Sequence, residues 1–90
     1  MITWDEAKRL RNQREHDIDL ALVEPVFDAP MVTSEDSRLA YNEQRLKSIG
    51  LLNGGVVVLV WTERAAGAHV FSCRKAEKHE QRTYFAQAQI

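Results

Sequence analysis

The chain has 90 residues, enough for one domain but too few for two separate hydrophobic cores. Hydrophobic residues make up 44% and charged residues 28%, a balance that is typical of a folded globular protein and excludes a disordered chain. The formal net charge of −1 is unevenly distributed, because residues 1–42 carry five Lys and Arg against nine Asp and Glu, whereas residues 43–90 carry seven against four. The basic second half favours an anionic ligand, although chance clustering of ordinary surface charge explains it equally well.

The cysteine content and the apolar runs bear on the cellular compartment. Cys73 is the only cysteine, so no intrachain disulfide forms and nothing indicates an oxidising compartment. Charged residues from Asp5 onward argue against an apolar leader, and the longest apolar run, Val56 to Trp61, is too short to span a bilayer. We therefore expect one cytoplasmic domain over residues 1–90 that makes no membrane contact.

The first third of the chain predicts helices. Apolar spacing predicts a helix over residues 5–16 with Asp5 as its N-cap. A second short helix is predicted over residues 19–26, and Pro25 is expected to kink or end it because proline cannot donate a backbone hydrogen bond. Residues 2–3 are compatible with a short strand.

The rest of the chain predicts strands followed by a helix. Val56 to Trp61 is apolar on both faces, which is typical of a central strand. The expected elements are a strand at residues 31–33, a polar loop at 34–37, strands at 45–51, 55–64 and 69–75, a turn at 53–55, and a helix at 77–88. The sequence therefore predicts an α+β domain with a small antiparallel sheet of three to four strands, two N-terminal helices and one C-terminal helix.

Common metal, nucleophile and phosphate-loop motifs are missing. His16, His69 and His79 are too far apart in sequence for the usual zinc spacings, and no Cys-x-x-Cys pair exists. Cys73 alternates with His69 and Phe71 and is expected to be a small core residue. The glycines fit turns and form no phosphate loop. We expect no metal and no cofactor.

Basic residues lie along the predicted strands. Arg45 and Lys47 share one strand face, while Arg64 and Arg74 lie near the ends of the next two strands. Such cations can stabilise the charge that develops on phosphorus when RNA is cleaved without a metal, provided that a base and an acid are also present. The alternative, which composition alone favours, is that these arginines form salt bridges on a solvated face with Glu43, Glu63 and Glu80.

These residues belong to a longer ordered pattern. Its members are Trp4-Asp5, Lys8, Asn12 and His16, then Val26-Phe27-Asp28 and Pro30, then Glu43, Arg45 and Gly50, then Thr62-Glu63-Arg64, and finally residues 72–76, Glu80 and Tyr84. No single piece is specific, but the ordered set strongly resembles the BrnT family, toxins of bacterial type II toxin–antitoxin modules. The resemblance covers nearly the whole chain.

The resemblance implies a fold, an activity and partners. It implies a RelE-like ribonuclease fold and a metal-independent endoribonuclease that cleaves RNA and arrests growth. It also implies neutralisation by a BrnA-type antitoxin whose ribbon-helix-helix part binds DNA. A heterotetramer of toxin and antitoxin would then repress its own operon, so that the toxin meets DNA only through its partner.

Nine residues are candidates for the RNA site. The three arginines are expected to bind phosphate and stabilise the transition state, two further residues are candidates for proton transfer, and four are expected to bind or orient the substrate. The catalytic candidates are Arg45, Arg64, Arg74, Tyr84 and Glu63, and the substrate-binding candidates are Lys8, His16, Lys47 and His69. Lys8 and His16 have the alternative role of holding the first helix to the sheet.

The chain departs from the family pattern at several positions. His69 stands where the family commonly has an arginine, and histidine loses its charge near neutral pH. Cys73 stands where alanine is common, Asp17 where glycine is usual, and Pro25 interrupts the second helix. An alternative function is therefore a catalytically decayed module that only holds the antitoxin and co-represses the operon. A third reading is a monomeric structural or adaptor domain.

Overall fold

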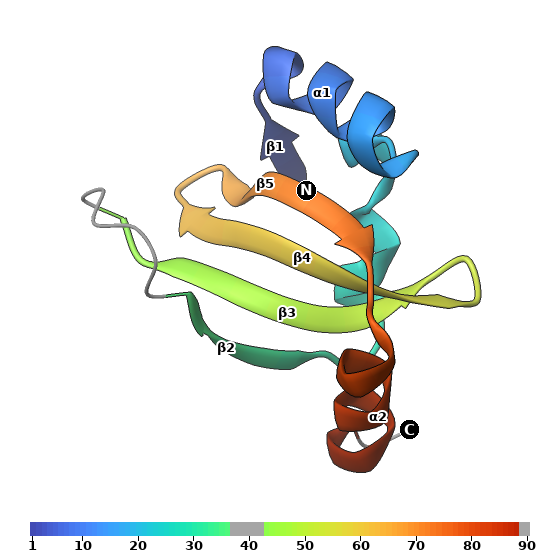
Figure 1. Cartoon of the computed structure of the whole chain (residues 1–90). Helices are drawn as coiled ribbons and strands as arrows, with labels where there is room; N and C mark the ends of the chain where they lie inside the picture. The colour runs from blue at the N-terminus through green and yellow to red at the C-terminus, as the bar shows by residue number, and fades with distance from the viewer. Residues whose placement is uncertain (37–42, 89–90) are drawn as a thin grey trace.

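A computed structural model describes residues 1–36 and 43–88 and shows an α+β fold built on one mixed sheet (Figure 1). The elements in chain order are β1 (Ile2–Trp4), α1 (Glu6–His16), the 3-10 helices η1 (Leu20–Leu22) and η2 (Glu24–Asp28), β2 (Val32–Asp36), β3 (Arg45–Leu52), β4 (Gly55–Arg64), β5 (Gly67–Lys75) and α2 (Lys78–Gln87). In this part of the chain, no helix is long and apolar enough to cross a membrane.

The sheet is larger than the sequence predicts and is not purely antiparallel. Its strand order is β1-β5-β4-β3-β2, in which β1 runs parallel to β5 and the other pairs are antiparallel. Residues 34–36, which were expected to belong to a polar loop, continue β2 as far as Asp36. They pair with β3 through backbone hydrogen bonds, which do not require apolar side chains. Ser37, the last residue of that predicted loop, lies outside the described residues.

The predicted strands of the β3–β4–β5 meander are confirmed. β4 occupies the centre of the sheet, as the apolar run predicts, and β3 and β4 join through a two-residue turn. Asn53 and Gly54 both have positive φ there, 51° and 81°, which is the backbone that such hairpin turns require. β5 begins two residues earlier than expected, at Gly67.

The predicted second helix is wrong, because the segment forms two 3-10 turns. Asp19 does cap η1 by accepting from the Ala21 amide at 2.9 Å, but Pro25 lies in the first turn of η2. An α-helix passing through this position would press the proline ring against the carbonyl four residues earlier. The three-residue period of 3-10 helices instead lines up Leu20, Val23 and Val26, all fully buried.

The two faces of the sheet are covered differently. On one face, strand side chains pack with η1 and η2, which lie behind the sheet in Figure 1, in a cluster of Ile2, Leu20, Val23, Val26, Val57, Leu59, Trp61, Val70 and Cys73. On the other face, α2 buries only a small cluster of Ile49, Val58 and Tyr84 near one end. The remainder of this second face, between α1 and α2, carries basic side chains of β3 and β5 on either side of Val60 of β4.

Gly50 of β3 lies where the larger cluster leaves no room for a side chain. A Cβ at this position would lie 2.7 Å from Cγ1 of the fully buried Val26. We expect Gly50→Ala to lower the free energy of unfolding by about 1–3 kcal/mol, measured by urea denaturation. Gly55→Ala is the matched control, because its nearest atom, Leu52 O, is 3.7 Å away. Equal stability of the two variants would contradict this account.

Candidate functional site

A β-bulge in β5 sets which side chains reach the open face of the sheet. Val60 pairs with Ser72 and the next residue, Trp61, pairs with Val70, so that Phe71 is an extra residue without a partner in β4. Val70 and Cys73 are both fully buried in the larger cluster. Because the bulge interrupts the alternation of the strand, the two residues between them both project to the opposite, open face.

The ring of Phe71 is the meeting point of cations from three elements. The guanidinium carbon of Arg45 lies 3.7 Å from the ring centroid, the ammonium of Lys8 lies 5.0 Å from it, and the guanidinium carbon of Arg64 lies 5.9 Å from it. The His69 ring meets Phe71 edge-on, with 5.2 Å between centroids. The structure therefore brings four of the nine candidate residues together around an aromatic ring.

A second group of charges surrounds Glu80 at the start of α2. Arg74 donates two hydrogen bonds to the Glu80 carboxylate, at 2.8 and 2.9 Å, and the Lys47 ammonium lies 3.6 Å from it. Glu80 is only 4% exposed, and the hydrogen bonds from Arg74 lower the pKa of its carboxyl from 4.5 to about 2. This bidentate pair fixes the Arg74 guanidinium beside the open face.

The depressed pKa makes Glu80 a source of acid sensitivity. Its stabilising effect is fully present above the ordinary carboxyl pKa and is lost as the pH falls from about 4.5 toward about 2. We expect the melting temperature of the wild type to fall more steeply than that of Glu80→Gln as the pH is lowered across this window. Parallel pH profiles for the two proteins would show that the carboxylate does not contribute.

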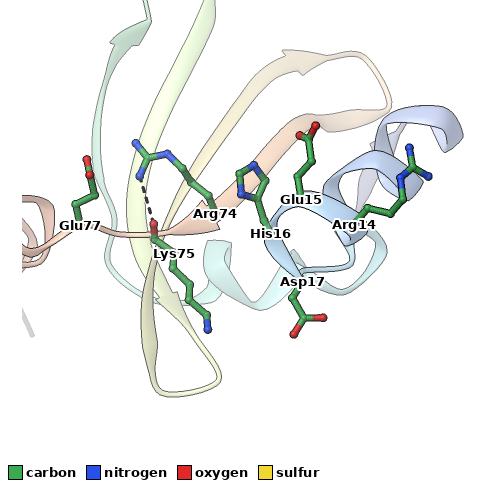
Figure 2. A pocket seen from close by; sticks show the side chains of 7 residues that line it. All are labelled: Arg14, Glu15, His16, Asp17, Arg74, Lys75 and Glu77. Atoms are coloured by element: carbon green, nitrogen blue, oxygen red, sulfur yellow. Dashed lines mark hydrogen bonds between the residues drawn. The ribbon is translucent and has the colours of Figure 1, made fainter.

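Three adjoining hollows run across the open face and the end of α1. One of about 200 Å³ is lined by Lys8, Arg11, Asn12, Glu15, His16, Arg45, Val60, Phe71 and Ser72. The next, of about 480 Å³, is lined by His16, Ser34, Glu35, Asp36, Lys47, Val58, Val60, Ser72 and Arg74. Figure 2 shows the third, in which His16 at the end of α1 lies across from Arg74 of β5. His16 lines all three hollows.

Asn12 holds α1, and with it Lys8 and His16, against β5. Its buried amide donates to Ile18 O at 2.8 Å and to Cys73 O at 2.9 Å, and its oxygen accepts from the Cys73 amide at 3.1 Å. β1 pairs with β5 only along residues 68–70, so this side chain bonds the β5 edge beyond the point where β1 stops. The Asn12 side chain therefore anchors the helix that carries the candidate residues Lys8 and His16.

The ion-pair alternative raised by the sequence is confirmed for two arginines. Arg64 donates to both oxygens of Glu43, at 2.7 and 2.9 Å, and Arg74 pairs with Glu80 as described above. Arg64 remains 42% exposed and Arg74 35%, so both guanidiniums stay accessible to a ligand. Carboxylates and phosphates bind arginine with the same fork geometry, so the pairs do not exclude phosphate binding.

His69 lies in an environment that disfavours its charged form. Its Nδ1 is 2.8 Å from the hydroxyl oxygen of Thr3, in a hydrogen bond between β5 and β1. Burial lowers the pKa of His69 below its ordinary value, and the positive charge of Arg64 lowers it further. At neutral pH, His69 therefore supplies less positive charge to the site than an arginine at this position would.

Two predicted catalytic residues do not line the three hollows. Tyr84 is fully buried in the smaller apolar cluster, and its hydroxyl donates to Pro30 O at 2.8 Å. Glu63 is exposed and alternates with Thr62 and Arg64, which places it on the other face of β4. The structure therefore corrects the expectation that either side chain is positioned to transfer a proton in the hollows.

Cys73 is a core residue, as the sequence predicts, although not on the expected strand face. It is fully buried, and burial raises the pKa of its thiol to about 12, which keeps it protonated. Regular alternation predicted that it shares one face with His69 and Phe71, but the bulge turns it to the opposite face. A nucleophilic role is inconsistent with this environment.

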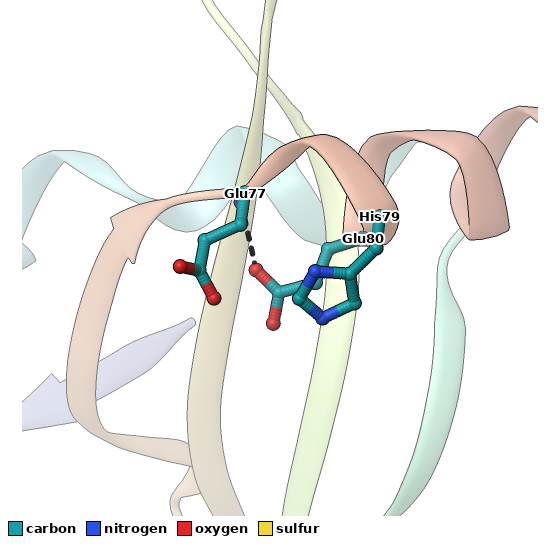
Figure 3. Close-up of side chains that lie close together, drawn as sticks. All are labelled: Glu77, His79 and Glu80. Atoms are coloured by element: carbon teal, nitrogen blue, oxygen red, sulfur yellow. Dashed lines mark hydrogen bonds between the residues drawn. The ribbon is translucent and has the colours of Figure 1, made fainter.

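One group of potential metal ligands lies at the start of α2. Figure 3 shows Glu77, His79 and Glu80, whose ligand atoms lie within 4.8 Å of one another. The Glu80 carboxylate already accepts from the Glu77 amide at 2.8 Å and from Arg74. These bonds cap the first turn of the helix and already use the Glu80 carboxylate oxygens as acceptors, so we assign no metal to the group.

The nine site candidates chosen from the sequence leave out several residues that line the site. Phe71, Ser72, Ser34, Asp36 and Arg11 line the hollows but were not candidates. Phe71 had a visible signal, since it is an aromatic residue close to a predicted strand-end arginine. Strict alternation nevertheless assigned it to the face of Cys73, and nothing in the sequence marks the bulge.

Comparisons with known proteins agree with the pattern of residues. A family model described as the ribonuclease toxin BrnT of type II toxin–antitoxin systems matches residues 4–80. The crystal structure of the Brucella abortus ribonuclease toxin BrnT matches with a TM-score of 0.64 at 27% sequence identity, covering 86% of this chain and 96% of that chain. A search of curated proteins gives no match. The family match spans most of the chain, and we conclude that this protein belongs to the BrnT family of ribonuclease toxins from type II toxin–antitoxin systems.

Proposed function

We propose that this chain is an endoribonuclease toxin that cleaves RNA without a metal ion and arrests growth. The observation that carries the proposal is the convergence of seven candidate residues on the open face of the sheet. Lys8, Arg45, Arg64 and His69 surround Phe71, while His16, Lys47 and Arg74 line the adjoining hollows. Such a set of cations matches the charge of an RNA backbone.

The proposed chemistry assigns different tasks to the cations and to His16. The 2′-hydroxyl oxygen attacks the neighbouring phosphorus and gives its proton to His16, and the 5′ oxygen leaves with a proton from water. Arg74 and Lys47 neutralise the charge that develops on the phosphoryl oxygens, because they line the same hollow as His16. His16 is preferred to Tyr84 and Glu63 because it alone of the three lines the hollows.

The proposed partner is a BrnA-type antitoxin that blocks this face. Its ribbon-helix-helix part would bind DNA, and a toxin–antitoxin heterotetramer would repress the operon, so DNA meets the toxin only through the antitoxin. The acidic first half of the chain supports a contact with a cationic partner segment. A RelE-like fold relationship and a cytoplasmic location belong to the same proposal.

Two assays test the proposed activity. Purified protein is expected to cleave single-stranded RNA in buffer with excess EDTA, leaving a cyclic phosphate and a 5′-hydroxyl end. Expression of the chain alone is expected to stop growth, and co-expression of the neighbouring antitoxin gene is expected to restore it. Intact RNA in EDTA together with normal growth would overturn the proposal.

A decayed binding module is the second candidate function. The carboxylates of Glu43 and Glu80 already occupy Arg64 and Arg74, and His69 has a lowered pKa. If activity has been lost, expression of the chain alone leaves growth unchanged while the purified chain still binds the antitoxin. Repression of the operon by the complex, but not by antitoxin alone, would then identify the remaining role.

A further inference from the structure

Phe71 is an aromatic residue that lies outside both apolar clusters that the described residues form. It nevertheless lies in the central part of the sheet next to β4. The bulge turns its ring toward the open face, where it lines the hollow of about 200 Å³. A bulge that re-aims one side chain beside a functional site is a recurring structural device.

The surroundings of this ring select a particular kind of ligand. The guanidinium carbon of Arg45 lies over the ring at 3.7 Å from its centroid, and Lys8 and Arg64 lie within 6 Å of the centroid. Lys8 makes no ion pair with any residue that the structure describes, whereas Arg64 pairs with Glu43. Several cations around a flat apolar surface fit a ligand that carries both negative charge and a π-system. An unpaired nucleotide, with its phosphate and its base, has both properties.

The position of the ring relative to the proposed phosphate site gives it a specific place on the RNA. The hollow lined by Phe71 and the hollow lined by Lys47 and Arg74 share His16 and Ser72 as walls. A nucleotide whose phosphate lies in the second hollow therefore has its neighbouring base within reach of the first. In a duplex both faces of that base are covered by stacking, so only an unpaired base can use the ring.

We propose that Phe71, together with the Arg45 guanidinium, is a stacking platform for one unpaired base beside the scissile phosphate. This inference rests on the proposed ribonuclease function and adds the class of substrate, single-stranded RNA or an RNA loop. The platform recognises the flat face of the base and not its hydrogen-bonding edge. The resulting preference is therefore for unpaired over paired RNA, with only a modest preference among bases.

Abasic substitutions around the cut site test the platform, because cleavage itself fixes the register of the RNA. In the wild type, removing the base at one position next to the scissile phosphate is expected to lower kcat/KM about tenfold or more. Phe71→Leu is expected to lower kcat/KM by a similar factor on intact RNA, mostly through KM, and to be insensitive to the abasic position. Phe71→Trp is expected to restore both properties.

Phe85→Leu is the matched control, because Phe85 is 58% exposed on α2 and lines none of the three hollows described above. Melting temperatures of all variants identify any loss that comes from unfolding. Equal abasic sensitivity of the wild type and Phe71→Leu would overturn the platform while leaving the ribonuclease function intact. A Phe71→Leu variant that loses only antitoxin binding would also overturn it, in favour of a protein contact. If the wild type cleaves no RNA, both the function and the platform are overturned.

Discussion

Arg74→Ala is expected to give an unstable protein that no longer cleaves RNA. Glu80 is 4% exposed, and Arg74 donates a hydrogen bond to each of its two carboxylate oxygens. Removing the arginine leaves a buried carboxylate whose remaining countercharge, among the residues that the structure describes, is the more distant Lys47. We expect the free energy of unfolding to fall by about 3 kcal/mol and the cleavage rate to fall by about 10²–10³-fold. Urea denaturation and single-turnover cleavage measure the two losses.

A double variant separates the two roles of Arg74. Arg74→Ala/Glu80→Gln removes the uncompensated charge, so that most of the stability is expected to return while cleavage stays low. Arg82→Ala is the matched control, because Arg82 is an exposed arginine of α2 that lines none of the described hollows. If the double variant regained wild-type cleavage, the contribution of Arg74 would be purely structural and its assignment as a phosphate ligand would be wrong.

Asn12→Ala is expected to cause the largest loss of stability among substitutions in α1. The side-chain amide of Asn12 makes three hydrogen bonds with backbone groups, two of which connect the middle of α1 to the edge of β5. Alanine would leave the amide and carbonyl of Cys73 in a buried position without these partners. We expect a loss of about 3 kcal/mol and a melting temperature lower by about 10 °C or more, measured by circular dichroism.

The neighbouring Gln13 supplies the comparison for Asn12. Gln13 is exposed, and its side-chain amide donates to the Asp17 side chain at 3.3 Å, so Gln13→Ala is expected to change stability by less than about 0.5 kcal/mol. Because Asn12 anchors the helix that carries Lys8 and His16, cleavage by Asn12→Ala should also fall at temperatures where the protein is still folded. A stable Asn12→Ala variant would mean that the surrounding apolar contacts alone fix α1.

The sequence predicted correctly those elements that depend on neighbouring residues alone. The apolar run of β4 has no polar face to expose, so its central place follows from its own residues. Asn53-Gly54 specifies the hairpin because these residues accept positive φ, and Asp5 caps α1 by accepting from the Lys8 amide at 3.1 Å. The cations of the second half were likewise predictable as candidates, because their charge and their places along the strands follow from the residues themselves.

Tertiary contacts decided the features that local rules missed. The parallel pairing of β1 joins segments 66 residues apart, and three-residue strands carry too little pattern to predict it. Tyr84 fitted a catalytic role in the sequence, but its hydroxyl has a partner in Pro30 O, which only the packed structure supplies. Side-chain identity alone does not distinguish a buried, bonded tyrosine from an accessible one.

The amino-acid sequence by itself determined the α+β class, the central strand, the hairpin turn, and a set of basic residues that matches the BrnT family. The tertiary structure decided which of those residues form a site. A single unpaired residue in β5 reverses the alternation of the strand, so that Phe71 faces Lys8, Arg45 and Arg64 instead of the core. Such a bulge arises from the register between β4 and β5, which depends on both strands together and is encoded by neither strand alone.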